Sequence, residues 1–398
     1  MTRPLDGIRV LDIATFIAAP FCGAIMAEFG AEVIKVEKPG VGDPLRKLGT
    51  LTATGDSLTW FSEARNKKSI TLDLRKPKGA ALLKRLAADA DVVLENFRPG
   101  TLEKWGLGFE ELQAVNRGLI LLRISAYGQT GPNRDLPGFA RIAHAFSGIS
   151  HLVGTPDGPP LIPGSTTLAD YMAGAYGVMG VLMALRVRDA TGEGQSIDVG
   201  LYEPIFRLLD ELVPAYDREG VVRGRTGAET FYAVPHSHYP TRDGKWVAVA
   251  CTNDKMFERL CAVMGCPELA SEGRLGTFPQ RQAAREEVNE LVENWTRRRT
   301  QADAVAECAA GQVPCGPIYS VAEIFEDPQY RARGDLETVD DPRIGPLTVP
   351  AVFPFLSKTP GRIDTLGPAL GAHNTEIYQG RLGLSAQELD RLKAEGVV

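Results

Sequence analysis

The first half of the chain alternates short aliphatic runs with longer segments in which apolar residues recur at helical spacing. Residues 7–14, 32–37 and 69–74 have the length and the nearly continuous hydrophobicity of buried strands. Residues 21–31 and 77–90 lie between or after these runs and have the spacing of helices. Because parallel strands joined by helices require right-handed crossovers, this pattern predicts a parallel sheet covered on both faces.

The same alternation continues to about residue 200. Residues 91–97 and 119–128 are further predicted strands, and a long helix over 171–186 precedes a turn, a strand and a helix start within 191–203. We therefore expect an α/β fold in which the first 200 residues form a Rossmann-like domain.

A second, smaller domain is expected after a loop over 223–235 that is rich in Gly, Thr and Arg. Residues 238–251 predict a hairpin, because an Asp-Gly step that suits a tight turn separates two β-rich runs. Helical spacing follows at 254–264, 283–298 and 302–310. These elements predict a small α+β domain that ends near Asp327 and Pro328.

The last part of the chain has little periodicity. Residues 342–368 are rich in Pro and Gly and are expected to be extended or loop-like, and only 386–394 is clearly helical. A tail of this kind seldom folds alone. We expect it to pack back on the first domain or on a partner subunit.

Charge and composition narrow the choice of partners. The 398 residues include 44 Lys and Arg against 50 Asp and Glu, a net charge of −6, so no global basic field favours nucleic acid or an anionic membrane. The sequence has neither an uninterrupted apolar run of about 18 residues nor a signal pattern at its N-terminus, which predicts a cytoplasmic protein without a membrane partner. The six cysteines are widely spaced, which predicts reduced thiols rather than a disulfide scaffold.

The turn after the first strand does not have the sequence of a dinucleotide site. It reads TFIAAPFCG at 15–23 in place of GxGxxG. GxxxxGK(S/T) and GxSxG are absent from the chain, which argues against P-loop and α/β-hydrolase chemistry. His236 and His238 have the i,i+2 spacing of one strand face, but no further ligand residue stands near them, so no metal site is expected.

The sharpest single feature is Asp170, the one acidic residue within the apolar, small-residue-rich stretch 164–186. One interpretation is structural: the carboxylate caps the helix by accepting hydrogen bonds from its first amides. The other is chemical: a carboxylate at a water-poor helix end acts as a nucleophile or proton carrier. The local pattern leaves both open.

Basic residues gather at predicted strand ends and in the loops that follow them. In a parallel sheet such loops border the ligand crevice, so a polyanion such as a nucleotide phosphate is one interpretation, and a solvated face is the other. Phe97 and Trp105 interleave with these residues and could flank an adenine or belong to the core. The basic residues are Lys38, Arg46, Lys47, Arg65, Lys67, Lys68, Arg75, Arg98 and Lys104.

Several motifs, in consecutive order, resemble the family III CoA-transferases, the formyl-CoA transferase or CaiB–BaiF type. They include GIRVLDIATFIAAPFCGAIMAEFGAEVIKVEKPG, ARNKKSITLDLRKPKG, ENFRPGTLEKWGLGFEEL, TTLADYMAG and TGEGQSIDV. The resemblance implies a Rossmann-like, CoA-binding domain built from residues 1–200 and 335–398. It also implies a linker over 201–229, a small α+β domain with its return linker over 230–334, and an interlocked dimer.

The resemblance further implies the site residues. It places the nucleophilic aspartate at Asp170, which must be ionised to attack, and we expect the helix end to keep its pKa low. It implies acyl-CoA and carboxylic acid substrates and no permanently bound cofactor or metal. Residues 223–229 are only a loose analogue of the loop that covers the site in the formyl-CoA member. With Arg98 added from the basic residues, the implied CoA contacts are Phe16, Ala18, Lys38, Leu72, Arg75, Asn96, Phe97, Arg98, Lys104 and Trp105.

Two alternatives to a transferase follow from the same resemblance. The family includes α-methylacyl-CoA racemases, but Phe139 stands where the racemase histidine would be, and His144 is five residues away and is expected to point elsewhere. A non-catalytic CoA-binding subunit of a hetero-oligomer is the second alternative, which the intact Asp170 disfavours.

The resemblance implies succinyl-CoA as donor and a small dicarboxylate such as malate, citramalate or itaconate as acceptor. A second carboxylate needs a cation, and Arg141 is the candidate. Arg141 could equally be a structural ion-pair partner.

Overall fold

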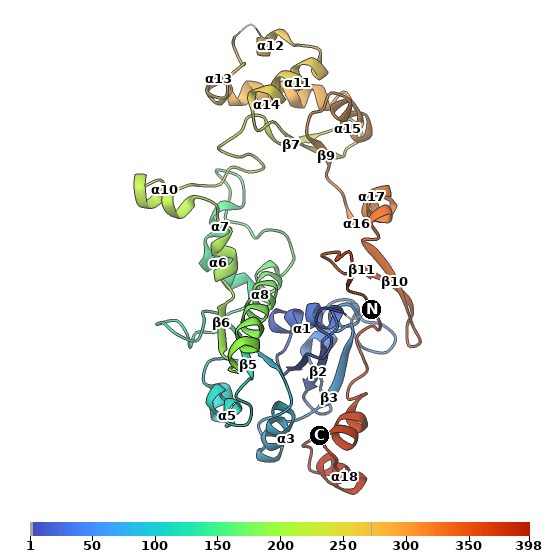
Figure 1. Ribbon diagram of the computed structural model, residues 1–398. Coiled ribbons are helices and arrows are strands. Elements are labelled where there is room, and N and C mark those ends of the chain that lie inside the picture. The colour runs from blue at the N-terminus through green and yellow to red at the C-terminus, as the bar shows by residue number, and fades with distance from the viewer. Residues whose placement is uncertain (1–2, 272) are drawn as a thin grey trace. The chain divides into compact units, whose positions relative to one another are not determined.

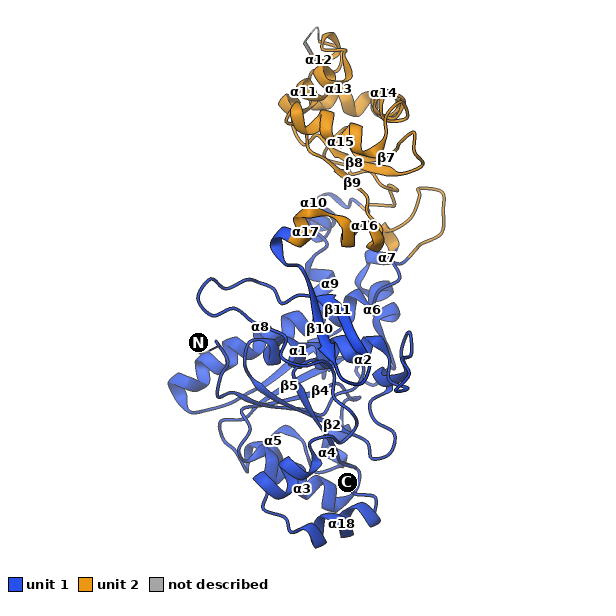
Figure 2. Ribbon diagram, turned by 90° about the vertical axis from the view of Figure 1, so that its right-hand side faces the viewer, with its two compact units in different colours: residues 1–150, 162–221, 332–398 blue, residues 151–161, 222–331 orange. Residues whose placement is uncertain are grey.

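The computed structural model describes residues 3–271 and 273–398, which divide into two compact units (Figure 2). Unit 1 combines the chain up to Ser150 with Ile162–Val221 and Ala332–Val398, and unit 2 combines His151–Leu161 with Val222–Arg331. The domain boundaries expected at residues 200, 229 and 334 stay a prediction.

Unit 1 is built on a six-stranded sheet in which every neighbouring pair is parallel. The strand order β3-β2-β1-β4-β5-β6 reverses direction between β1 and β4. The predicted α/β class with a parallel sheet is therefore confirmed. The strands are β1 (Arg9–Asp12), β2 (Glu32–Glu37), β3 (Lys67–Thr71), β4 (Val92–Glu95), β5 (Ile120–Ser125) and β6 (Ser196–Gly200).

Alternate residues of the strands face two separate cores, as period-two geometry requires. Val10 and Val92 belong to the core under α1 (Ala18–Glu28) and α8 (Leu168–Thr191). Their neighbours Leu11 and Val93 belong to the opposite core. That second core also contains residues of α3 (Pro77–Ala87), α18 (Ala386–Ala394) and the π-helix Glu376–Arg381.

Helix α8 lies against α1 and the sheet in unit 1 (Figure 1). Its glycines allow this close approach: a Cβ at Gly174 would lie 2.5 Å from the Ala18 carbonyl oxygen, and one at Gly177 would lie 2.8 Å from Leu122 Cδ2. Among the described helices, α8 alone has the length and apolar composition of a membrane span. It packs on α1, β5 and β6, as a core helix does.

The C-terminal segment covers the outer edge of β3. The backbone N–H of His373 donates to the Ser69 carbonyl oxygen at 2.9 Å, and the Tyr378 hydroxyl donates to the Thr71 carbonyl oxygen at 2.7 Å. The Asn374 side-chain oxygen accepts from the Thr71 N–H at 2.9 Å. The expectation that the tail packs back on the first domain is confirmed.

Residues 342–368 were expected to be extended or loop-like, and residues 345–350 are extended, as part of a hairpin that the sequence did not predict. β10 (Leu336–Asp341) and β11 (Gly345–Pro350) form an antiparallel hairpin. Val339, Leu347 and Val349 of this hairpin pack against Phe61. The hairpin is stabilised by this long-range contact, which a local pattern of Pro and Gly does not reveal.

Unit 2 has an antiparallel sheet of three strands, β7 (His236–Pro240), β8 (Trp246–Ala250) and β9 (Cys315–Pro317). The predicted hairpin is present, with Gly244 at φ +75° in its turn. Three helices cover the sheet's core: α11 (Asp254–Met264), α14 (Arg285–Thr296) and α15 (Gln301–Ala310). All six cysteines of the chain are free.

The remaining helices are short: α6 and α10 have eight residues each, and the others have four to six. They are the 3₁₀ turn Pro44–Lys47, α2 (Leu58–Glu63), α4 (Thr101–Lys104), α5 (Phe109–Gln113), α6 (Ala140–Ser147), α7 (Ile149–Leu152), α9 (Glu203–Arg207), α10 (Leu212–Glu219), α12 (Glu268–Ser271), α13 (Phe278–Ala283), α16 (Val321–Glu326) and α17 (Pro328–Arg333).

Candidate active site

A pocket of about 500 Å³ opens in unit 1 at the carboxyl ends of β1, β4 and β5. In parallel sheets the loops at this edge, where the strand order reverses, form the usual ligand crevice. The lining comes from residues 15–18, 96–99 and 124–126, from the region 134–144 around the start of α6, and from residues 162–170.

Asp170 lies in the first turn of α8 and lines this pocket. The N-cap of the helix is Thr167, and the Asp170 N–H itself donates to the Thr167 carbonyl oxygen at 3.0 Å. No hydrogen bond or ion pair to the Asp170 carboxylate is found within residues 3–271 and 273–398. The capping interpretation of Asp170 is therefore wrong, because its carboxylate is bonded to none of the helix amides.

Burial raises the pKa of Asp170 to about 6. The expectation that the helix end keeps this pKa low is wrong for a physical reason. Removing a carboxylate from water disfavours its charged form, and no donor or cation among the described residues contacts it to compensate. At pH 7 the carboxylate is still mostly ionised, but it is poorly solvated, which suits a nucleophile.

The loop after β1 is held in one conformation by two polar side chains. Asn96 accepts the Thr15 N–H at 2.8 Å and donates to the Thr15 carbonyl oxygen at 2.6 Å. Asp43 Oδ1 accepts the Phe16 N–H at 3.0 Å. Phe16 has φ +62°, a left-handed conformation that a bulky residue adopts only when its surroundings impose it.

Asp43 is in turn anchored by a buried network. Lys35 Nζ lies 2.9 Å from Asp43 Oδ2 and also donates to the Ala14 carbonyl oxygen. Asp12, fully buried, contacts Lys35 and Lys67. Burial opposes the charge of Asp12, but the two lysines hold its pKa below the ordinary value. This network holds Asp43, and through it the β1 loop, in place.

The β4 loop carries the predicted aromatic pair. The rings of Phe97 and Trp105 meet edge to face, with centroids 5.1 Å apart. Glu95 Oε2 accepts the Phe97 N–H at 2.7 Å, and Arg123 joins Glu95 to Glu103 with bonds of 2.7 Å to each. Burial raises the pKa of Glu95 to about 7 although Arg123 opposes this. Glu95, held by Arg123, thus fixes the backbone at Phe97, and Trp105 contacts the Phe97 ring.

Three arginines contribute positive charge to the pocket: Arg98, Arg134 and Arg141. Arg134 lies 3.5 Å from Asp135, and both side chains are exposed. No carboxylate pairs with Arg98 or Arg141 anywhere in the described chain. Arg141 therefore makes no ion pair within the described chain, and its role stays a prediction.

The structure brings seven of the predicted site residues to the pocket and leaves five outside its lining. Leu72 as a whole residue is only 2% exposed and belongs to the core. Arg75 pairs with Asp73 at 2.7 Å. The seven are Phe16, Ala18, Asn96, Phe97, Arg98, Arg141 and Asp170, and the five are Lys38, Leu72, Arg75, Lys104 and Trp105.

Five of the nine basic residues pair with carboxylates, one of them being Arg75 with Asp73, so they are not all free for a polyanion. Arg46 pairs with Glu37, Arg65 with Glu28, Lys67 with Asp12 and Lys68 with Glu32, each at 2.7–2.9 Å. These ion pairs tie strands and helices together and use the charges structurally. The other four, Lys38, Lys47, Arg98 and Lys104, have no acidic partner within the part of the chain that the structure describes.

The sequence did not predict that two residues, Phe139 and His144, line the pocket. Phe139 contacts Phe16 edge to face, with centroids 6.1 Å apart. His144, expected to point away, lines the same pocket and accepts the Ala169 N–H on Nε2 at 3.0 Å. The expectation failed because Phe139 is the extended N-cap of α6, so the two residues are not related by helical rotation. Burial, with help from Arg141, lowers the pKa of His144.

No group of three or more His, Cys, Asp and Glu side chains that could hold a metal ion occurs in residues 3–271 and 273–398. His236 and His238 lie on β7 of unit 2.

Comparisons with known proteins agree with this arrangement. The sequence model of CoA-transferase family III matches residues 5–374. The succinyl-CoA–L-malate CoA-transferase beta subunit of Chloroflexus aurantiacus is 52% identical over 399 residues, which cover 100% of this chain and 98% of that protein. The succinyl-CoA–D-citramalate CoA-transferase of the same organism is 46% identical, covering 100% of this chain and 98% of that protein. A crystal structure of a CAIB/BAIF family protein from Brucella suis has a TM-score of 0.84 at 35% identity, covering 96% of this chain and 100% of that chain.

Proposed function

This chain belongs to the family III CoA-transferases, and from that premise we propose that it transfers coenzyme A from succinyl-CoA to a small dicarboxylic acid. The names of its relatives specify L-malate and D-citramalate as acceptors. Malate, citramalate and itaconate are acids of this size and charge. The observation that carries the proposal is an unpartnered, half-buried carboxylate, Asp170, in a pocket that also holds the unpaired arginines Arg98 and Arg141.

The reaction begins when an Asp170 carboxylate oxygen attacks the thioester carbonyl of the donor. The C–S bond breaks, and the products are an aspartyl-acyl anhydride and CoA thiolate. The thiolate then attacks the Asp170 carbonyl, which releases the donor acid and leaves an aspartyl-CoA thioester. The acceptor carboxylate attacks this thioester, which expels the CoA thiolate and forms an anhydride between Asp170 and the acceptor. The thiolate then attacks the acceptor carbonyl of that anhydride, which forms the new acyl-CoA and frees the Asp170 carboxylate. One thioester replaces another, so the exchange is close to thermoneutral.

The protein's part in these steps is to position groups and exclude water. Burial removes solvent from the Asp170 carboxylate and protects the anhydride from hydrolysis. The Ala169, Asp170 and Tyr171 amides of α8 already have acceptors, whereas no acceptor for the Leu168 N–H is found in the described chain, so that amide is the candidate donor to an oxyanion. The fixed β1 loop, with Phe16 and Ala18 in the lining, forms the facing wall.

Arg141 supports a dicarboxylate as the acceptor. One carboxylate of the acid must react at Asp170, and the other requires a cation inside the pocket. Arg141 lines the pocket without an acidic partner in the described chain. A guanidinium can hold a carboxylate through two parallel hydrogen bonds, so it discriminates a diacid from a monoacid.

The β4 loop supports the placement of the CoA nucleotide. Phe97 and Trp105 meet edge to face, and the ring that keeps its face open is suited to stack on an adenine. Lys38, Arg98 and Lys104 remain available for phosphates, which are the anions that CoA carries.

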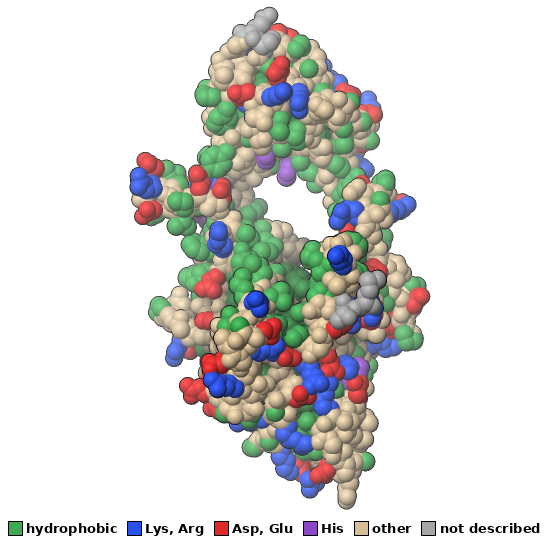
Figure 3. All heavy atoms as spheres, viewed as in Figure 1, with side chains coloured by type: hydrophobic (Ala, Val, Ile, Leu, Met, Phe, Trp, Pro, Cys, Tyr) green, Lys and Arg blue, Asp and Glu red, His purple; other side chains and the backbone are tan. Residues whose placement is uncertain are grey.

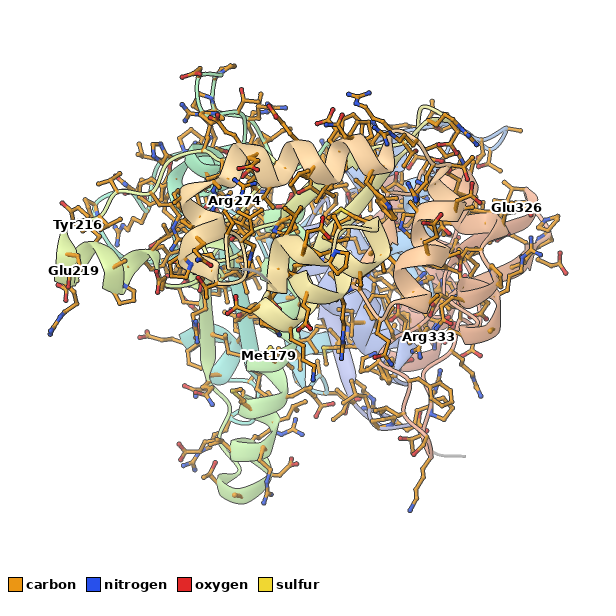
Figure 4. The ribbon with its side chains drawn as sticks, turned by 90° about the horizontal axis from the view of Figure 1, so that it is seen from above. Met179, Tyr216, Glu219, Arg274, Glu326 and Arg333 are labelled. Carbon is orange, nitrogen blue, oxygen red and sulfur yellow. The ribbon has the colours of Figure 1, made fainter. Side chains whose placement is uncertain are left out.

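We further propose a dimer, either of two identical chains or with a related chain, because the relative described above is named as a beta subunit. The outer face of α8 exposes Met179 (48%), Leu182 (44%) and Met183 (63%), and Figure 4 labels Met179 on this helix. Hydrophobic side chains also gather over α6 and α8 in Figure 3. The cytoplasmic location expected from the sequence also stays a proposal.

The direct test mixes the purified protein with succinyl-CoA and L-malate and follows malyl-CoA by mass spectrometry. We expect malyl-CoA from the wild type and at least a thousandfold lower rate from Asp170→Asn, which keeps the shape of the side chain but not the nucleophile. Hydroxylamine or borohydride should trap the wild-type Asp170 during turnover. An unmodified Asp170 during active exchange would exclude the covalent route.

The alternatives give different outcomes in the same assays. A racemase would incorporate deuterium at the α-carbon of a 2-methylacyl-CoA without any acceptor acid. A non-catalytic subunit would bind CoA thioesters but form malyl-CoA only after a related chain is added.

A further inference from the structure

We infer that His144 is a positioning residue that fixes the first turn of α8, and with it Asp170, by accepting the Ala169 N–H on its Nε2 atom. This inference rests on the proposed role of Asp170 as nucleophile. His144 comes from α6, a different helix, and its sequence position is 25 residues away from Ala169.

The start of α8 needs an acceptor from elsewhere. The first amides of any helix lack partners inside the helix, and an N-cap side chain usually supplies one. Thr167 is the N-cap here, but its side chain makes no capping hydrogen bond. The Ala169 N–H donates instead to His144 Nε2 at 3.0 Å.

This contact is buried on both sides. The exposed fraction is 2% for His144 and 0% for Ala169. A buried amide that loses its acceptor also finds no water in its place, so the hydrogen bond decides whether this turn is ordered. Asp170 is the next residue and lines the same pocket as His144. A disordered first turn would therefore move the nucleophile directly.

The contact requires a neutral imidazole. Nε2 accepts only when its lone pair is free, so the single proton is on Nδ1. Protonation would remove the acceptor and place a positive charge at the positive end of a helix. The charged side chains of the pocket are Arg98, Arg134 and Arg141, which disfavour that charge, and Asp170, which favours it.

Helix α9 also packs against α6, and it carries one acidic and one basic side chain, Glu203 and Arg207. The Glu203 carboxylate accepts the Gly200 N–H at 2.7 Å. The Glu203 carboxylate of α9 therefore already accepts a hydrogen bond from the backbone at the end of β6.

Variants of His144 can be matched by whether their side chain places an acceptor atom where Nε2 lies. A Gln side-chain oxygen reaches about as far as Nε2, whereas an Asn oxygen reaches only about as far as Nδ1. His144→Gln should therefore restore the hydrogen bond, while His144→Asn and His144→Ala should leave the Ala169 amide without an acceptor. His151→Gln, an exposed histidine of α7 outside the pocket lining, controls for the substitution itself.

Steady-state kinetics with succinyl-CoA and L-malate provide the main readout. We expect kcat to fall about tenfold or more in His144→Ala and His144→Asn, with the KM for succinyl-CoA unchanged within about twofold. His144→Gln should retain kcat within about threefold of the wild type, and His151→Gln should equal it. Equal losses in the Gln and Ala variants, or a loss expressed only in KM, would overturn the inference.

A measurement independent of activity separates this inference from the proposed function. In protein labelled with ¹⁵N-histidine, NMR should show His144 neutral with its proton on Nδ1, and thermal unfolding should show His144→Gln to be folded. An Nε2-protonated or cationic His144 would refute the inference even if CoA transfer is observed. If the wild type forms no malyl-CoA, the proposed function fails, and the role of His144 in positioning a nucleophile fails with it. If the wild type is active and His144→Ala is equally active, the His144 inference alone fails.

Discussion

At the scale of single residues, the chemistry of the pocket depends on one carboxylate that the protein leaves without a partner. Other buried acids of unit 1, such as Asp12 and Asp43, are paired with lysines. Asp170 is not, and its pKa rises to about 6. Reactivity in this pocket therefore follows from desolvation of the nucleophile rather than from the helix dipole.

The pH dependence of activity follows from this pKa. The ionised carboxylate attacks, so activity is present above pH 6 and is lost as the pH falls through about 6. We expect kcat/KM for succinyl-CoA to decrease tenfold per pH unit below that value. The same decrease of kcat/KM below pH 6 should be seen in His144→Gln, because the titrating group is Asp170. A flat profile down to pH 5 would contradict this prediction.

The role of Arg141 predicts a change in acceptor affinity. Arg141→Ala should raise the KM for L-malate about tenfold to a hundredfold, because the second carboxylate loses a charged bidentate partner. The KM for a short monocarboxylic acid should be nearly unchanged. Initial rates with both acids measure the difference. Arg186→Ala, an exposed arginine of α8 outside the pocket lining, is the control and should behave as the wild type.

At the scale of elements, the pocket depends on how closely α1 and α8 approach each other. Gly174 of α8 lies against the Ala18 carbonyl oxygen at the start of α1, and Ala18 lines the pocket. The two helices bring the β1 loop and Asp170 to the same cavity only because position 174 has no side chain. The small residues of this stretch are thus a requirement of the site as well as of the core.

Gly174→Ala tests this contact. The added Cβ would lie 2.5 Å from a backbone oxygen, which must shift, so we expect a loss of about 1–3 kcal/mol in the free energy of unfolding and at least a tenfold lower kcat. Denaturant titration and malyl-CoA formation measure the two effects.

Gly180→Ala is the control within the same helix. There the nearest atom is a side-chain methyl of Ile197 at 3.1 Å, which can move. The gain in helix propensity, up to about 1 kcal/mol, should offset most of that contact. Equal damage at both positions would refute the assigned importance of the α1–α8 approach.

At the scale of the whole molecule, unit 1 takes its sheet from the first half of the chain and its edge cover from the C-terminal segment. The C-terminal segment covers the edge of β3, but no part of the described chain covers the apolar face of α8 that carries Met179, Leu182 and Met183. An exposed apolar face of this kind is typical of a surface that a partner covers. The proposed dimer would bury it.

The assembly can be measured directly. Light scattering after size-exclusion chromatography should give twice the chain mass of 43.0 kDa for the wild type. Met183→Glu places a charge on the exposed face of α8 and should shift the protein toward the monomer at micromolar concentration. Val115→Glu, an exposed apolar position after α5, should leave the mass unchanged. A monomeric wild type would exclude the dimer.

The sequence by itself determined the α/β class, most strands and helices, and Asp170 as the residue to examine. These features depend on hydrophobic periodicity and local motifs, which neighbouring residues carry. Residues 32–37 and 254–264 match their elements to the residue for this reason.

Only the tertiary structure decided how polar side chains are used. Asn96 bonds to a loop 81 residues earlier, Asp43 to a residue 27 earlier, and His144 to a helix 25 residues later. Five basic residues that could have met phosphates pair with carboxylates instead. Hydrogen bonds and ion pairs act over a few ångströms in space, and the order of strands in the sheet sets which distant residues come that close. The hydrophobic periodicity of a single segment does not determine that strand order.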